Sequence, residues 1–171
     1  MGWTAVEPVV PEDKCIILGA PHTSIWDFAV AYLYYTSVGG KPCCMIKSDL
    51  FWWPLGWILR KLGGIPVDRR KGSNAALSVI KEMKSQKKLH LALAPEGTRQ
   101  PVKRWKTGFH TIARQVGCPV YIGYFDWRTK RVGRGQKIEL TDDAKADMVR
   151  IQAMYEEMHL TGKHPKQYIT H

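Results

Sequence analysis

Short apolar runs alternate along this chain with longer segments in which apolar residues recur at helical spacing. The short runs predict strands over residues 15–20, 42–47, 64–68, 89–95 and 118–125. The longer segments predict helices over residues 24–38, 73–87, 107–117 and 141–160. Alternation of the two indicates the α/β class, with helices packed on a largely parallel or mixed sheet. We therefore expect one domain, a layered sandwich over residues 1–171.

Two further segments leave alternatives open. Residues 130–140, "KRVGRGQKIEL", predict either a hairpin or two short strands. Residues 50–62, "LFWWPLGWILRKL", are apolar on nearly every side, which predicts a helix. A helix over 51–62 would be only ~18 Å long, too short for a hydrocarbon layer of ~30 Å. It is either a buried core helix or an interfacial segment that contacts lipid, with Arg60 and Lys61 beside the headgroups.

The charge balance narrows the choice of partner. The chain has 26 lysines and arginines against 15 acidic residues, a net charge of +11. Such an excess predicts an anionic partner: nucleic acid, an acidic membrane surface or a phosphate-bearing substrate. The sign of the charge alone does not choose among them.

Targeting signals and cysteines bear on the compartment. The opening residues, "MGWTAVEPVVPEDK", lack the basic region and apolar run of a signal peptide. No apolar stretch approaches ~20 residues, the length that crosses a membrane as one helix. The four cysteines form no C-x-x-C pair, so we expect reduced, mostly buried thiols and no metal site. These features predict a cytoplasmic protein.

Three polar clusters follow predicted strands. They are "PHTSIWD" at 21–27, "PVDRRK" at 66–71 and "APEGTR" at 94–99. In α/β sheets, ligands bind where strands end and helices begin. The clusters are therefore the candidate site.

The first cluster allows two interpretations of His22 and Asp27. Ser24 with Asp27 fits a capping box, a common start of a helix, which would leave His22 as a surface turn residue. If His22 instead folds back over the first turn, Asp27 can orient one ring nitrogen. The other nitrogen is then free to act as a base on a hydroxyl group.

The second and third clusters also allow a structural and a functional interpretation. Asp68 and Arg69 begin either a solvated basic loop or an anion clamp, since the planar fork of arginine pairs with phosphate. The third cluster is either a plain turn or a ligand loop. In the second case its glycine admits close approach of the backbone and its threonine and arginine offer phosphate donors.

Taken together, the clusters resemble the glycerolipid acyltransferase family, which contains 1-acyl-glycerol-3-phosphate acyltransferase. The family's H-x4-D motif matches His22 to Asp27, and its glycine, apolar stretch and Asp-Arg match Gly63 to Arg69. Its P-E-G-T-R motif matches Pro95 to Arg99 without change, and its proline-containing strand matches residues 118–120. The order and spacing of all four motifs make the resemblance specific, and it covers roughly residues 14 to 140.

The resemblance implies a glycerol-3-phosphate acyltransferase-like fold and an activity. A fatty acyl group would move from acyl-CoA or acyl-carrier protein to a hydroxyl of a lysophospholipid or glycerol-phosphate-like acceptor. His22 would be the general base and Asp27 its orienting partner. The residues that would bind the polar head of the acceptor are Arg69, Glu96, Gly97, Thr98 and Arg99. The resemblance implies no metal or redox cofactor, and peripheral contact with an anionic membrane.

Departures from the family pattern concern the acceptor more than the reaction. Pro21 stands where the family often has asparagine, and Gln100 where it often has serine. The alternative from another class is a non-enzymatic module that binds anionic membranes or nucleic acid. Because no RNA-recognition consensus, zinc finger or G-x-x-G hairpin occurs, we expect no nucleic-acid partner.

Overall fold

A computed structural model of the chain describes residues 2–68 and 73–168. The described strands are β1 (Thr4–Ala5), β2 (Lys14–Ala20), β3 (Pro42–Lys47), β4 (Gly64–Val67), β5 (Leu89–Leu93), β6 (Val120–Asp126), β7 (Arg131–Gly133) and β8 (Lys137–Ile138). The described α-helices are α1 (Ile25–Ser37), α2 (Leu55–Lys61), α3 (Ser73–Ser85), α4 (Gly108–Val116) and α5 (Ala144–Glu157). Two short 3-10 turns, η1 (Ser48–Leu50) and η3 (Pro165–Gln167), complete them.

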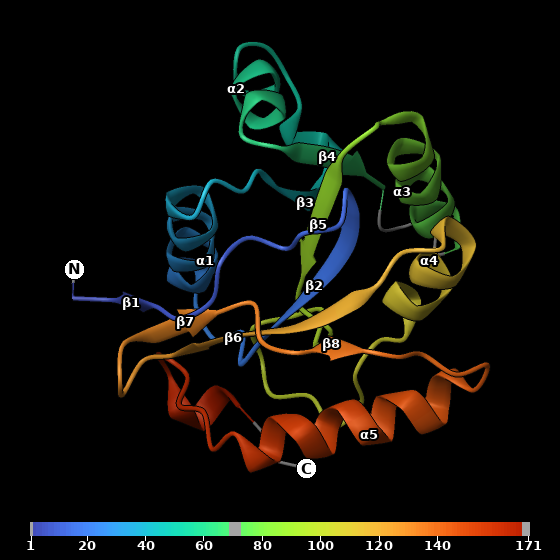
Figure 1. Cartoon of the computed structure of the whole chain (residues 1–171). Helices are drawn as coiled ribbons and strands as arrows, with labels where there is room; N and C mark the ends of the chain where they lie inside the picture. The colour runs from blue at the N-terminus through green and yellow to red at the C-terminus, as the bar shows by residue number, and fades with distance from the viewer. Residues whose placement is uncertain (1, 69–72, 169–171) are drawn as a thin grey trace.

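The strands form one mixed sheet in the order β1-β7-β6-β2-β5-β3-β4, with β8 paired to β6 (Figure 1). The five strands from β6 to β4 are mutually parallel. Helices cover both faces of this sheet (Figure 1). The predicted α/β sandwich with a largely parallel sheet is therefore confirmed.

Successive side chains of a strand point to opposite faces of the sheet, so the core has two layers. Ile16 and Leu18 of β2 pack on the face covered by α3, α4 and α5. Cys15, one position away, packs on the opposite face with Tyr34 and Tyr35 of α1. A sheet covered on both faces explains why its strands read as continuous apolar runs.

The edge of the sheet after β6 decides between the two interpretations of residues 130–140. Strands β7 and β8 each pair with β6 and not with one another, so they are two short strands in line. The break between them lies at Gly135, whose φ of +59° suits glycine. A Cβ there would overlap the carbonyl oxygen of Ile122, so the edge strand passes close to β6 at this point.

The start of α5 differs from the prediction because a residue later than the predicted first residue caps the helix. Helix α5 begins at Ala144 and not at 141, because the Asp143 side chain accepts the N–H groups of Lys145 and Ala146. Thr141 instead donates its N–H to the buried carboxylate of Asp147. Helix α4 ends as predicted, at Gly117 in the left-handed conformation.

Helix α2 is shorter than predicted and stands apart from the sheet (Figure 1). Pro54 precedes its first residue and disfavours helical backbone at Trp53, so the predicted helix over 50–62 shrinks to seven residues. Gly56 is the only buried residue of α2. The alternative of a buried core helix is therefore wrong. None of the helices in the described residues is long and apolar enough to cross a membrane.

All four cysteines are free thiols. Cys15 is buried under α1, and burial raises the pKa of its thiol. The other three are partly buried, and desolvation likewise raises the pKa of the Cys44 and Cys118 thiols to about 11. Thiols held in their neutral form are poor nucleophiles, so nothing in their setting indicates a catalytic cysteine.

Candidate active site

Three parallel neighbours, β5, β2 and β6, end at the same edge of the sheet, and the candidate site lies there. His22 follows the end of β2 by two positions, Glu96 follows β5 by three, and Trp127 follows β6 directly. Strand order, rather than closeness in sequence, brings these residues together.

His22 and Asp27 contact one another across the start of α1. The Nδ1 atom of His22 lies 3.3 Å from Oδ2 of Asp27. The imidazole is 24% exposed and the carboxylate 1% exposed. The same Oδ2 atom accepts the N–H groups of Thr23 and Ser24, both at 2.7 Å. Asp27 thus closes a capping box and faces His22 at once, so both interpretations of the motif describe the geometry.

Trp127 supplies a further donor to Asp27 that the sequence did not reveal. Its indole N–H donates to Oδ1 of Asp27 at 2.6 Å. The carboxylate therefore has N–H donors on both oxygens, which fixes its plane although the side chain is buried. Trp3 packs edge-on against Trp127 with ring centroids 5.0 Å apart.

Glu96 ties the third cluster to the first. Its Oε1 atom accepts the backbone N–H of His22 at 2.6 Å, a bond between loops 74 residues apart. Burial raises the pKa of the Glu96 carboxyl to about 7, and the nearby charge of Asp27 raises it further against the N–H bond from His22. The carboxyl therefore titrates near neutral pH, beside the backbone of the histidine.

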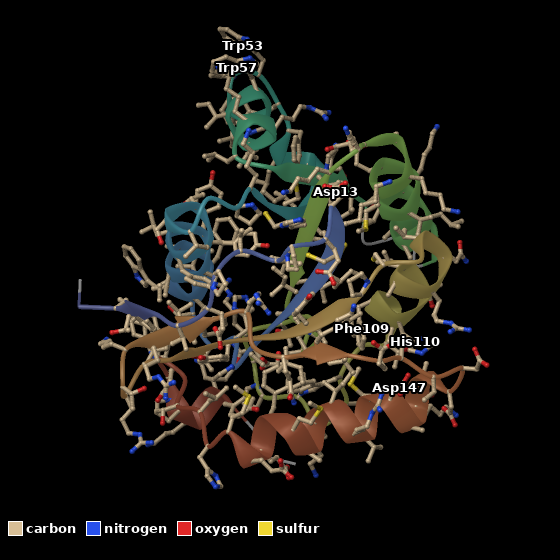
Figure 2. All side chains as sticks on the ribbon, viewed as in Figure 1. Asp13, Trp53, Trp57, Phe109, His110 and Asp147 are labelled. Carbon is tan, nitrogen blue, oxygen red and sulfur yellow. The ribbon has the colours of Figure 1, made fainter. Side chains whose placement is uncertain are left out.

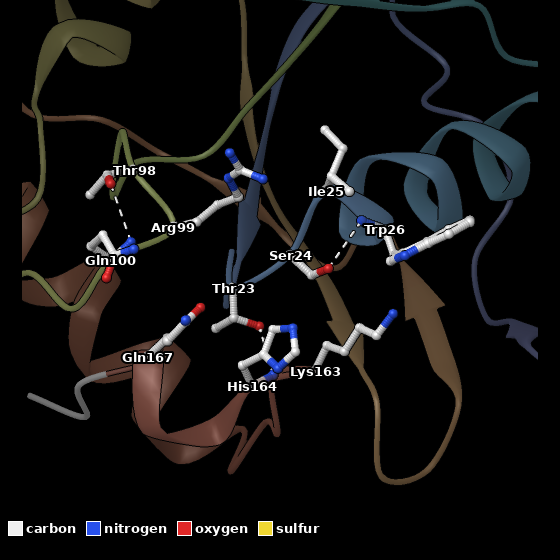
Figure 3. Close-up of a pocket in the computed structure, with 10 residues that line it drawn as sticks. All are labelled: Thr23, Ser24, Ile25, Trp26, Thr98, Arg99, Gln100, Lys163, His164 and Gln167. Atoms are coloured by element: carbon white, nitrogen blue, oxygen red, sulfur yellow. Dashed lines mark hydrogen bonds between the residues drawn. The ribbon is translucent and has the colours of Figure 1, made fainter.

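The rest of the third cluster forms a tight turn after β5. Gly97 adopts φ +70°, and a Cβ there would meet the side chain of Lys106. The Thr98 hydroxyl accepts the N–H of Gln100 at 3.2 Å. Arg99 directs its side chain into a hollow beside the start of α1 (Figure 3).

The second cluster, which follows β4, lies farther from β2 than the third cluster does. Strand β4 lies three strands from β2 in the sheet order, or about 14 Å at the usual spacing of ~4.8 Å. Asp68 ends the described part of this segment, and the predicted anion-binding residue Arg69 lies outside the described residues.

The hollow beside α1 has a volume of about 500 Å³ and opens to solvent (Figure 3). The described residues that line it are Thr23, Ser24, Ile25, Trp26, Thr98, Arg99, Gln100, Lys163, His164 and Gln167. None of these ten is acidic, and three carry or can carry positive charge. His22 is not one of them, although its neighbours Thr23 and Ser24 are.

A C-terminal segment, residues 161–168, forms one wall of the hollow, and sequence analysis missed it because only its polar composition stands out. The backbone N–H of His164 donates to Oγ1 of Thr23 at 3.2 Å. The amide nitrogen of Gln167 can donate to the carbonyl oxygens of Thr23, at 2.9 Å, and Arg99, at 3.1 Å. These bonds join the wall to both the first and the third cluster.

Comparison with known proteins identifies the family. A sequence model of the family described as acyltransferase matches residues 5–122, more than half of the chain. The chain belongs to this acyltransferase family. It is the glycerolipid acyltransferase family that the sequence motifs resemble. No curated protein and no solved structure gives a significant match. Membership supports an enzyme of acyl transfer over the alternative of a non-enzymatic binding module.

Two features of this acyltransferase lie beyond the matched residues. Trp127 and the wall at 161–168 both follow residue 122, where the family match ends. Across the described ranges 2–68 and 73–168, no three histidine, cysteine or acidic side chains gather as metal ligands.

Proposed function

We propose that the enzyme transfers a fatty acyl group from acyl-CoA or acyl-carrier protein to a hydroxyl of a lysophospholipid or glycerol-phosphate-like acceptor. The observation that carries this proposal is the contact of His22 Nδ1 with the buried, donor-fixed carboxylate of Asp27. That contact leaves Nε2 of His22 for the acceptor hydroxyl. A base of this kind contributes typically ~10²–10⁴ in rate.

The reaction balances with His22 as the only proton carrier. Nε2 removes the hydroxyl proton while the acceptor oxygen attacks the thioester carbonyl carbon. The tetrahedral intermediate then expels the thiolate as the C–S bond breaks, and the thiolate takes the proton from the imidazolium. Asp27 stabilises the imidazolium between these steps. Every proton transfer is assigned to His22, so the scheme needs no cofactor.

The cationic hollow supports an acceptor with a phosphate head. Arg99, Lys163 and His164 line it, and the N-terminal end of α1 opens into it, which favours an anion electrostatically. In this proposal the loop of Glu96, Gly97 and Thr98 shapes the head-group site. Arg69, which lies outside the described residues, is proposed as a further head-group ligand from the motif that it shares with the family. The acceptor would be met at the cytoplasmic face of an anionic membrane.

The test is thiol release from acyl-CoA in the presence of lysophosphatidic acid, glycerol 3-phosphate or neutral lysolipids. Release that depends on one acceptor class, with the acylated product recovered, would support the transferase and name its head group. Release with free fatty acid and no dependence on any acceptor would replace the proposal with thioester hydrolysis. The same series with acyl-carrier protein distinguishes the two donors.

Replacing Arg99 by alanine is expected to raise the KM for a phosphate-bearing acceptor by roughly tenfold or more. The side chain lines the hollow, and a charge-assisted bond to phosphate contributes on the order of 1.5–3 kcal/mol. The measurement is a set of saturation curves for acceptor and donor separately. Arg104→Ala, exposed in the same loop, is the matched control and should leave both constants unchanged. A change in donor KM alone would contradict the placement of Arg99.

Replacing Trp127 by phenylalanine is expected to lower kcat roughly tenfold with little change in the KM values, because Asp27 then positions His22 less well for proton transfer. The variant keeps an aromatic ring but loses the N–H that donates to Asp27. With one donor fewer, the plane of the buried carboxylate is fixed less firmly, so His22 is held less precisely for proton transfer. Trp3→Phe alters the ring packed against Trp127 without touching Asp27 and is the control. A wild-type kcat in Trp127→Phe would leave Trp127 with a packing role only.

A further inference from the structure

The segment from Ser48 to Leu62, here called the tryptophan knob, leaves large apolar side chains in solvent. Figure 2 shows Trp53 and Trp57 at its tip, the part of the knob farthest from the sheet. Trp53 is 86% exposed, Trp57 60% and Trp52 59%. Leu50, Ile58 and Leu62 are exposed too. Large contiguous apolar exposure marks an interaction surface, because water is a poor solvent for it.

Basic side chains lie beside aromatic rings of the knob. The Nζ atom of Lys61 lies 3.9 Å from the ring centroid of Trp57, and the guanidinium of Arg60 lies 5.3 Å from that of Phe51. The acidic residue of the knob, Asp49, is paired with Lys47 at 2.7 Å. Tryptophan rings with lysine and arginine beside them suit a lipid interface, where aromatic rings lie at the level of the anionic headgroups that attract the basic side chains.

We infer that the tryptophan knob inserts into the headgroup region of an anionic lipid bilayer and holds the enzyme there. This inference deepens the proposed function and rests on it for the choice of a lipid partner. Seven helical residues rise only about 10 Å, enough to enter the interface and not to cross it. The net charge of +11 adds long-range attraction to the same surface.

A second copy of the chain fits the knob less well. A projecting tip that docks on a different face of a second copy needs an apolar socket there. Of two hollows in the described residues, the one beside α1 has eight polar or charged residues among its ten, and the one between β6 and α5 has seven among its thirteen. A bilayer needs no preformed pocket, because its lipids rearrange around the side chains that enter the interface.

The test is sedimentation of the whole protein with vesicles of phosphatidylcholine alone or mixed with phosphatidylglycerol. The double variant Trp53→Ala, Trp57→Ala is expected to lose tenfold or more in partitioning onto the mixed vesicles. Arg60→Gln with Lys61→Gln should lose about fivefold for each charge removed, and only on the mixed vesicles. The control is Leu77→Ala with Val149→Ala, two exposed apolar residues on α3 and α5 that should change nothing.

Any of three outcomes would overturn the inference. If the tryptophan double variant binds the vesicles as well as the wild type does, the knob does not contact the membrane. Self-association of the wild type that disappears in the variant would make the knob a contact between copies. Short-chain acyl-CoA with a water-soluble acceptor separates this inference from the proposed function. Turnover there without vesicle binding refutes only the knob, and vesicle binding without turnover refutes only the acyl transfer.

Discussion

Replacing His22 by alanine is expected to lower kcat for acyl transfer by about 10²–10⁴-fold, the usual contribution of a positioned general base. The side chain lies at the edge of the site and is partly exposed, while its backbone N–H, which Glu96 accepts, remains in the variant. Folding should therefore survive. The measurement is acceptor-dependent thiol release, with the unfolding midpoint of the variant recorded beside it.

Two further observations make the His22 result specific. Added imidazole should restore part of the lost rate, since it can occupy the vacated space and take the hydroxyl proton. His159→Ala, at an exposed position beyond α5, is the matched histidine control and should retain wild-type turnover. A His22→Ala protein with near-native rate and intact fold would assign the base to another group.

The stability of the protein is expected to fall between pH 4.5 and about 7 through the titration of Glu96. Its pKa is raised from 4.5 to about 7, chiefly by burial, so the folded state holds a proton that the unfolded chain has already released. Unfolding then becomes easier as the pH rises through this window. The contribution of this group is about 3 kcal/mol, present in full at pH 4.5 and below and lost at pH values above 7.

Denaturant unfolding at several pH values, compared between the wild type and Glu96→Gln, checks this prediction. Glutamine cannot ionise, so the difference in unfolding free energy between the two proteins should change in favour of the variant as the pH rises. Glu139→Gln, at an exposed position, is the matched control and should keep the wild-type slope. Parallel curves for the wild type and Glu96→Gln would mean that Glu96 reaches solvent and ionises at its ordinary pH.

The fold could be predicted from the sequence because its central strands are buried on both faces. Continuous apolar runs gave β3 its observed bounds at residues 42–47, and the predicted strand at 15–20 lies within β2. The errors lie where local chemistry outweighs periodicity. Pro54 delays the start of α2, and Asp143 takes the N-terminal cap of α5 in place of the earlier Thr141.

The candidate site could be predicted only as far as its short-range parts. His22 and Asp27 share one turn, and Glu96 belongs to a recognisable motif, so local sequence identifies all three. Trp127 meets Asp27 across 100 residues, through a strand order that no local pattern encodes. The C-terminal wall depends on bonds in which one partner is a backbone group, such as the His164 N–H that donates to Oγ1 of Thr23, and backbone groups look alike in every sequence.

The wall of residues 161–168 sets the order in which the site can be completed. The His22–Asp27 contact lies within one turn of chain and needs only the start of α1. The bond from His22 to Glu96 waits for β5, and the bond from His164 to Thr23 waits for nearly the whole described chain. Because a domain generally folds as a unit, the site is complete only after residues 161–168 have been synthesised. A chain clipped before residue 161 would retain the paired histidine and aspartate beside an open-sided hollow.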